Sequence, residues 1–286
     1  MRHGIATVCL SGTLKRKLTA AANSGFDGVE LFEPDLTESG LAPTAVRAMA
    51  GELGLAIDLF QPFRDFEGVT GRQLARNLER AHATFDVMAQ LGADLLLVCS
   101  NVTPEAIDDD ALAAEQLHAL AEHAAAHGVR IAYEALAWGR HVSEYDHAWR
   151  IVEAADHPAL GTCLDSFHIL ALDTQLDTIA EIPAEKLFFC QLADATDLAV
   201  DVLQWSRHHR CLPGQGAFDL VDFTTRVLQT GYDGSLSLEV FSDAFRHADP
   251  GQVTQDARRS LAALEHQLRV GAVAGRHDII ERRGRW

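Results

Sequence analysis

The chain alternates between short apolar runs and longer amphipathic stretches, and this alternation limits the folds that it can adopt. We expect eight strands, at residues 5–9, 27–31, 55–60, 94–99, 129–134, 160–165, 186–191 and 235–240. The amphipathic stretches are predicted to be helices, because they begin at residues such as Thr13 or Pro43 and end at glycines such as Gly25 and Gly54. Further helices are expected at 70–92, 104–128, 143–156, 219–231 and 250–268. Apolar strands that alternate with helices are typical of a parallel sheet covered by helices.

Eight such units close most simply into a (β/α)8 TIM barrel of the α/β class, which takes about 250 residues. An open, doubly wound sheet is the alternative, but it would carry a G-x-G-x-x-G turn after the first strand, and Gly4 and Gly12 do not form one. We therefore expect a single catalytic barrel over residues 1–268. A basic C-terminal tail or linker remnant would follow over 269–286.

The charge and the cysteine content limit the classes of partner and the compartment that fit such a barrel. The chain has 24 Lys and Arg against 41 Asp and Glu, a net charge of −17, which argues against nucleic acid and anionic membranes. Its 5 cysteines form no C-x-x-C pair, and we see neither a signal peptide nor an apolar run of about 20 residues. We expect a cytoplasmic enzyme that acts on a small molecule. The sequence leaves open whether it forms a homo-oligomer.

Four successive strands end on a polar residue where an apolar one would be expected. Because parallel strand ends are neighbours around the rim of a barrel, three carboxylates and one amide oxygen would converge there. A divalent cation relieves the repulsion between them, and oxygen ligands favour magnesium, manganese, cobalt or a similar ion. Glu30, Glu33 and Asp58 also lie near strand ends, and the sequence does not separate supporting roles from salt bridges for these three. The four predicted metal ligands are Glu134, Asp165, Gln191 and Glu239.

Other polar residues lie in loops at the same end. His168 follows the sixth strand and is either a general acid or base or a residue that supports the metal ligands. Arg64 follows the third strand, where it either binds an anionic substrate or pairs with a nearby carboxylate. A long segment after the seventh strand, residues 192–218, carries Ser206, Arg207 and Arg210. The residues alone do not choose between its two arginines.

Several segments carry a resemblance to a known family. They include IATVCLSGTL, YEALAWGRH, LDSFHIL, SLSLEVFSDAFR and, most specifically, FQPFRDFEG and WSRHHRCLPGQG. Over roughly residues 3–250 the chain resembles the xylose-isomerase-like TIM-barrel superfamily, and within it the bacterial metal-dependent 3-dehydroshikimate dehydratases. Some members carry a dioxygenase-like domain after the barrel.

The resemblance implies an activity and a set of roles. The family's metal ligands fall on the four strand-end residues named above, and its substrate-binding and catalytic groups fall on Arg64, His168, Ser206 and Arg210. The implied reaction is the loss of water from 3-dehydroshikimate to give protocatechuate, in quinate and shikimate breakdown. A metal-stabilised enolate would form as His168, or a carboxylate of the metal site, removes the proton next to the ketone. Arg64 or Arg210 would hold the substrate carboxylate, and Ser206 would orient a substrate oxygen.

Three other functions remain as alternatives. A metal-dependent sugar isomerase or epimerase acting on a ketose or sugar acid would use the same barrel, but it commonly has a histidine where Gln191 stands. A DNA-repair nuclease would need a cluster of metals and a basic groove, which the net charge of −17 disfavours. A barrel that only binds a metabolite would not need a base such as His168.

Overall fold

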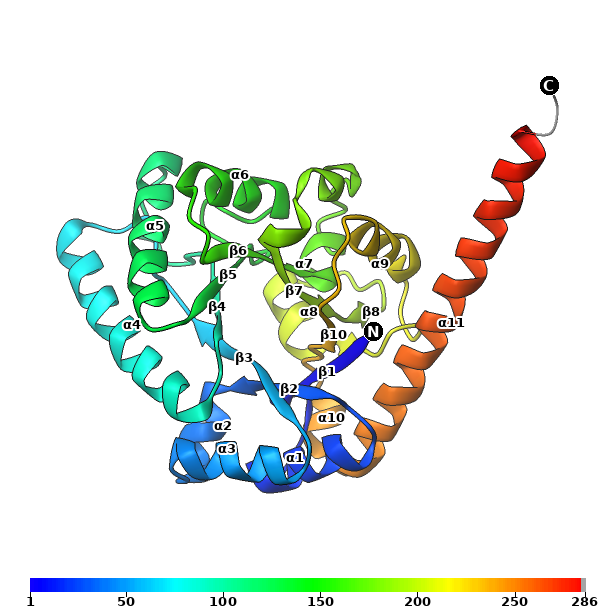
Figure 1. The fold of residues 1–286 in the computed structure, drawn as a ribbon, viewed down its shortest axis with the longest axis horizontal. Helices are drawn as coiled ribbons and strands as arrows, with labels where there is room; N and C mark the ends of the chain where they lie inside the picture. Colours follow the sequence, from blue (N-terminus) through cyan, green and yellow to red (C-terminus); the bar gives the residue numbers. More distant parts are fainter. Residues whose placement is uncertain (284–286) are drawn as a thin grey trace.

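The structure, a computed structural model, describes the backbone of residues 1–283 and the side chains of residues 1–270. Eight parallel strands close into a barrel in the order β1-β10-β7-β6-β5-β4-β3-β2, with helices around the outside (Figure 1). This confirms the predicted (β/α)8 TIM barrel. The barrel strands are β1 (Arg2–Ala6), β2 (Gly28–Phe32), β3 (Ala56–Phe63), β4 (Leu95–Cys99), β5 (Arg130–Glu134), β6 (Leu160–Asp165), β7 (Leu187–Leu192) and β10 (Ser235–Leu238).

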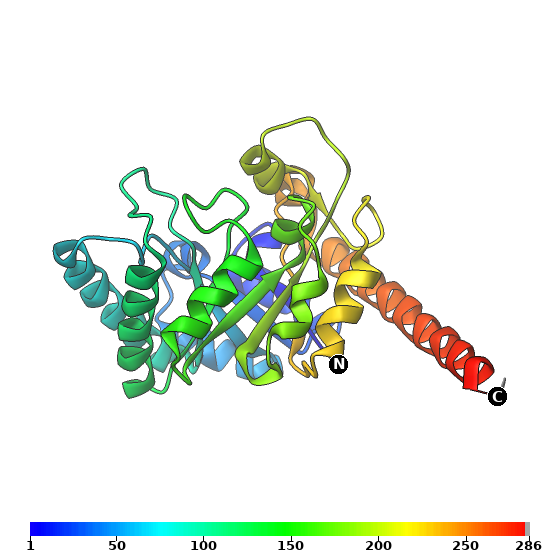
Figure 2. The ribbon, with the colours of Figure 1, turned by 90° about the horizontal axis from the view of Figure 1, so that it is seen from above.

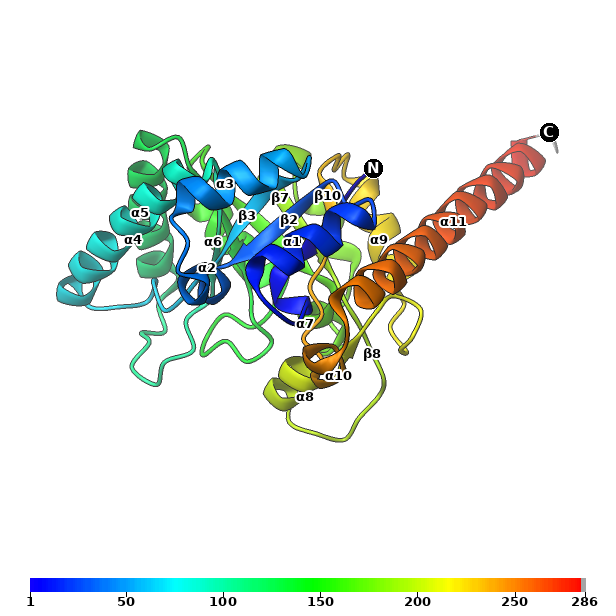
Figure 3. The ribbon, with the colours of Figure 1, turned by 90° about the horizontal axis from the view of Figure 1, so that it is seen from below.

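Seven helices of ten residues or more are α1 (Leu14–Asn23), α3 (Pro43–Glu52), α4 (Gly71–Leu91), α5 (Asp110–Ala126), α6 (Tyr145–Ala155), α9 (Leu220–Gln229) and α11 (Pro250–Arg283). Shorter helices and 3-10 turns are η1 (Thr7–Cys9), α2 (Glu33–Ser39), α7 (Ser166–Leu170), η2 (Asp177–Glu181), η3 (Ala184–Lys186), α8 (Val202–His208) and α10 (Asp243–His247). The loops at the carboxyl ends of the strands gather on one side of the barrel (Figure 2), and α8 and α10 lie together there (Figure 3). Among the described residues, no helix combines the length and the apolarity needed to cross a bilayer.

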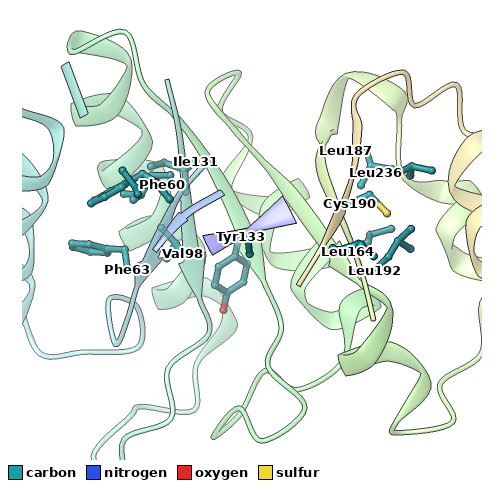
Figure 4. Packing of buried hydrophobic residues seen from close by; sticks show 14 of the residues in the cluster. Phe60, Phe63, Val98, Ile131, Tyr133, Leu164, Leu187, Cys190, Leu192 and Leu236 are labelled. Carbon is teal, nitrogen blue, oxygen red and sulfur yellow. The ribbon is translucent and has the colours of Figure 1, made fainter. Parts of the chain in front are cut away.

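The strands bury both of their faces. One large cluster fills the space between strands and helices and includes Phe60, Val98, Ile131 and Leu236 (Figure 4). A smaller cluster, formed by Leu59, Leu95, Leu97, Cys99, Ala132, Leu136, Cys163 and Phe189, takes the alternate strand positions. Successive residues of a strand point to opposite faces. Glu134, Asp165 and Gln191 therefore continue the face of this smaller cluster, at the carboxyl end of their strands.

Among the differences between the structure and the sequence-based prediction, three concern the first strand and two helices. The first strand is residues 2–6 instead of 5–9, because its ladder with β10 begins at Arg2 and residues 7–9 turn into η1. Helix α5 starts at residue 110 instead of 104, where Asp109 caps it by accepting the Leu112 N–H at 3.1 Å. Helix α11 continues past residue 268 to Arg283. A tail or linker over 269–286 stays a prediction, and residues 284–286 of it lie outside the described part.

The long segment after β7 is organised by one buried carboxylate. Besides α8, the segment forms a small antiparallel pair, β8 (Asp194–Ala195) with β9 (Arg210–Cys211). Asp194 Oδ2 accepts the N–H groups of Gly214 and Gly216, both at 2.9 Å. Its Oδ1 accepts the Phe218 N–H at 3.1 Å. A Cβ atom at Gly216 would lie 2.3 Å from Asp194 Oδ1, so the close approach requires glycine there.

We expect Asp194→Ala to lower the free energy of unfolding by roughly 2–4 kcal/mol, because buried N–H groups lose their acceptors. The matched control is Asp201→Ala in the same segment. Asp201 caps the exposed start of α8 through Leu203 and Gln204, and its loss should cost about 1 kcal/mol. Urea unfolding of both variants measures the difference. Equal losses would contradict a special role for Asp194.

Candidate active site

The four polar residues predicted at the strand ends meet at the carboxyl end of the barrel, and all four are buried. Glu134 and Asp165 are the last residues of β5 and β6. Gln191 pairs in register with Asp165 across β6 and β7, and Glu239 directly follows β10. The four residues therefore lie at the same end of four neighbouring strands, and their role as metal ligands stays a prediction.

Glu134 has the strongest need for a positive partner. Its Oε2 accepts the Cys99 thiol at 3.3 Å, whereas its buried Oε1 has no hydrogen-bond partner. Burial, followed by the neighbouring Asp165 and Glu239 carboxylates, raises the pKa of Glu134 well above its usual range. Ligand atoms of Glu134, Asp165 and His168 lie within 4.8 Å of one another. A divalent cation fits this arrangement, because it would give the unpartnered oxygen a ligand role and cancel repulsion.

Arg210 lies between the carboxylates. Its Nη1 donates to Asp165 Oδ2 at 2.7 Å and to Glu239 Oε2 at 3.1 Å. Its Nη2 donates to Ser206 Oγ at 2.8 Å. The guanidinium is buried, with its carbon 4.4 Å from the centre of the Phe167 ring. Burial outweighs the attraction of Arg210 and raises the pKa of Asp165 to about 6. The described hydrogen bonds of the Arg210 guanidinium are thus made with other groups of the protein.

His168 lies on α7 with both ring nitrogens in contact with other groups. Nδ1 accepts the Ala137 N–H at 3.2 Å, and Nε2 lies 3.2 Å from Arg210 Nη2 and 3.5 Å from Asp165 Oδ2. Burial and the nearby arginines, Arg210 first, hold the pKa of His168 well below its usual value. The ring is therefore neutral and can accept at one nitrogen only. Because Nδ1 accepts the Ala137 N–H, Nε2 carries the ring hydrogen in this arrangement. A base role at Nε2 requires the other tautomer, which gives up the Ala137 contact.

Glu30 supports Gln191 from inside the barrel. Its Oε2 accepts the amide N–H of Gln191 at 2.5 Å and that of Gln61 at 2.8 Å, while its Oε1 accepts the Ser237 hydroxyl at 2.5 Å. This contact fixes which end of the Gln191 amide is the oxygen, and that oxygen accepts the Cys163 thiol at 3.3 Å. The sequence left Glu30 between two roles. A charged residue on the inward face of an apolar strand is the sequence signal that favours the supporting role over a salt bridge.

A small cavity lies beside these groups. Arg64 reaches it from the loop after β3, and Ser206 and Arg207 reach it from α8. Asp165, which contacts Arg210, and Gln191 do not line it. The lining residues are Gln61, Arg64, Leu97, Cys99, Glu134, Leu136, Trp138, His168, Ser206, Arg207, Arg210, Glu239 and Phe241. Six of the eight predicted site residues thus line one cavity, and Asp165 and Gln191 lie outside its lining.

Comparisons with known proteins agree with this architecture. A family model described as "Xylose isomerase-like TIM barrel" matches residues 18–264. The 3-dehydroshikimate dehydratase of Pseudomonas putida is 55% identical over 270 residues, which are 94% of this chain and 42% of that protein. This chain therefore spans less than half the length of that curated relative.

Two solved structures show the same fold. A xylose isomerase-like TIM barrel/4-hydroxyphenylpyruvate dioxygenase fusion protein superposes with a TM-score of 0.94 and 54% identity, over 96% of this chain and 44% of the fusion chain. A structure of IOLI protein with a bound zinc atom superposes with a TM-score of 0.84 and 19% identity, over 92% of this chain and 98% of that chain. At that identity the second match supports the fold alone.

We expect Glu134→Gln to make the metal-free protein more stable at neutral pH. The pKa of Glu134 is raised in the folded protein. Its protonated side chain therefore contributes fully to the free energy of unfolding below its pKa in the unfolded chain, about 4.3, and this contribution is lost as the pH rises through its pKa in the folded protein. Glutamine mimics the protonated form, so the variant should show a higher melting temperature in chelator at pH 7.5 and a weaker dependence on pH. Exposed Glu52→Gln is the control. A lower melting temperature for Glu134→Gln would contradict the unpaired charge.

Proposed function

Because this chain belongs to the xylose isomerase-like TIM-barrel family, we propose that its barrel is a metal-dependent 3-dehydroshikimate dehydratase that forms protocatechuate and water. The observation that carries the proposal is the 55% identity to a protein of that name over 94% of this chain. The matched region is 42% of the relative, so the proposal assigns the dehydratase activity to the part of the relative that corresponds to this barrel. The reaction would belong to quinate and shikimate breakdown.

The carboxylates Glu134, Asp165 and Glu239 would hold the cation, with the amide oxygen of Gln191 as a fourth ligand. Glu30 favours this by taking the amide hydrogen of Gln191. When bound, a magnesium, manganese or cobalt ion supplies positive charge beside the ketone oxygen, where negative charge develops as the neighbouring proton leaves. The unpartnered oxygen of Glu134 supports this assignment.

His168 is our candidate for the proton transfer. Loss of water requires removal of the proton next to the ketone and departure of the β-hydroxyl group. A neutral imidazole can take this proton without first losing one, and burial and the nearby arginines keep His168 neutral. A cavity-facing carboxylate, Glu134, is the fallback base.

Ser206 is suited to orient a substrate oxygen. Its Oγ accepts two N–H groups of Arg210, from Nη2 at 2.8 Å and from Nε at 3.3 Å. The hydroxyl hydrogen of Ser206 is consequently free to donate to an oxygen in the cavity. Arg210 meanwhile keeps Asp165 and Glu239 close together and lowers their mutual repulsion.

The direct test is to add 3-dehydroshikimate to the protein and to follow the absorbance of the catechol product. We expect product with magnesium, manganese or cobalt, none after treatment with a chelator, and recovery when metal returns. Ketohexoses, tested in parallel, should give no isomers. Isomers without any protocatechuate would favour the sugar isomerase instead, and no product with any of the three metals would refute the dehydratase.

We also expect His168→Gln to lower kcat by roughly 10²–10⁴-fold, the usual contribution of a positioned acid or base. Metal affinity, measured by titration with manganese, should change little, because the four proposed ligands remain. His147→Gln, a change at a partly exposed histidine on α6, serves as the control. An unaltered kcat in His168→Gln would transfer the base role to a carboxylate.

A further inference from the structure

Two arginines at the cavity have no acidic partner in the structure. Arg64 and Arg207 both line it, and within residues 1–270 neither forms a salt bridge. The acidic neighbours of Arg64 in the sequence are engaged elsewhere. Asp65 accepts the Val102 N–H at 3.3 Å, and Glu67 accepts the Asn101 N–H at 2.6 Å. Arg64 and Arg207 are therefore free to receive an anion from outside the chain.

Aromatic rings hold Arg207 in place. The carbon at the centre of its guanidinium lies 5.6 Å from the ring centre of Trp138 and 5.3 Å from that of Phe241. Its backbone carbonyl also accepts the Arg246 side chain at 3.1 Å. Stacking against rings leaves the N–H edges of a guanidinium available, so an arginine in this setting is prepared for a planar carboxylate.

The two charges act on the same small volume. Both arginines line the one cavity, and burial, and next the charge of Arg64, lower the pKa of Arg207. Two cations that face one cavity repel each other. An anion bound between them attracts both and offsets this repulsion. Arg210 is not equivalent, because Asp165 and Glu239 already compensate its charge.

We propose that Arg64 and Arg207 form a two-arginine clamp that binds the carboxylate of the substrate, and that Arg207 makes the cavity selective for carboxylate-bearing ligands. This inference rests on the proposed dehydratase for the identity of the ligand. It moves the anchor from Arg210 to Arg207, three residues earlier. Arg210 is then a residue that holds the metal-site carboxylates together.

The clamp can be tested by binding alone. Protocatechuate and catechol share two adjacent hydroxyl groups, and only protocatechuate has a carboxylate. For the manganese-loaded protein, calorimetry should give tighter binding of protocatechuate than of catechol. Arg207→Ala and Arg64→Ala should each reduce this preference by at least about tenfold and leave catechol affinity within about twofold. Arg207→Lys keeps the charge but loses the planar fork, so it should recover only part of the preference.

The control is Arg226→Ala, which removes the same charge from α9, where Arg226 pairs with Asp177 and Asp222 outside the cavity. It should leave the preference unchanged. A preference that survives Arg207→Ala refutes the clamp, whether or not the protein turns over 3-dehydroshikimate. Conversely, a preference that depends on Arg207 in a protein without turnover supports the clamp and refutes the dehydratase.

In steady-state assays, Arg207→Ala should raise KM for 3-dehydroshikimate at least about tenfold with little change in kcat. Arg210→Ala should instead lower kcat, since it removes the contacts that hold Asp165 and Glu239. The same kinetic effect from both variants would contradict the separate roles.

Discussion

The concentration of carboxylates inside the mouth of the barrel is the constraint on which the site depends. Glu134, Asp165 and Glu239 are buried within one small region, and burial there penalises every charge that is not compensated. Arg210 supplies part of the compensation through contacts at 2.7 and 3.1 Å, and the bare oxygen of Glu134 indicates that more is needed. A divalent cation at the proposed site would supply the rest of this compensation.

The barrel itself could be read from the sequence because its signals are local and repeated. Apolar runs recur eight times with amphipathic stretches between them, and the carboxyl ends of parallel strands must lie side by side. These two signals are sufficient to predict a shared position at one end of the barrel for Glu134, Asp165, Gln191 and Glu239. The first strand was misplaced by three residues because IATVC is as apolar as a strand, although its second half turns into η1.

The sequence could not assign the polar residues that work in loops. Arg207 and Arg210 differ by three positions in one segment, and their roles depend on where α8 ends and β9 begins. The backbone N–H of Arg210 donates to the Phe241 carbonyl at 3.1 Å, a contact between segments about 30 residues apart. Glu30 was ambiguous for a similar reason, since its three partners come from three other strands. Contacts of this kind are set by tertiary packing, which no local pattern encodes.

The segment fastened by Asp194 carries both arginines on one short stretch of chain. Arg210 is tied to the carboxylates of the metal site, whereas Arg207 stands against Trp138 and Phe241. This segment thereby fixes the spacing between Arg207 and the proposed metal site, and the acid group and chelating oxygens of a ligand would have to match that spacing. The site at the mouth of the barrel would then select ligands by the distance between these groups. Among small hydroxylated acids, those with a rigid ring of the right size would bind more tightly than flexible chains of the same composition, because a flexible chain loses conformational entropy on binding.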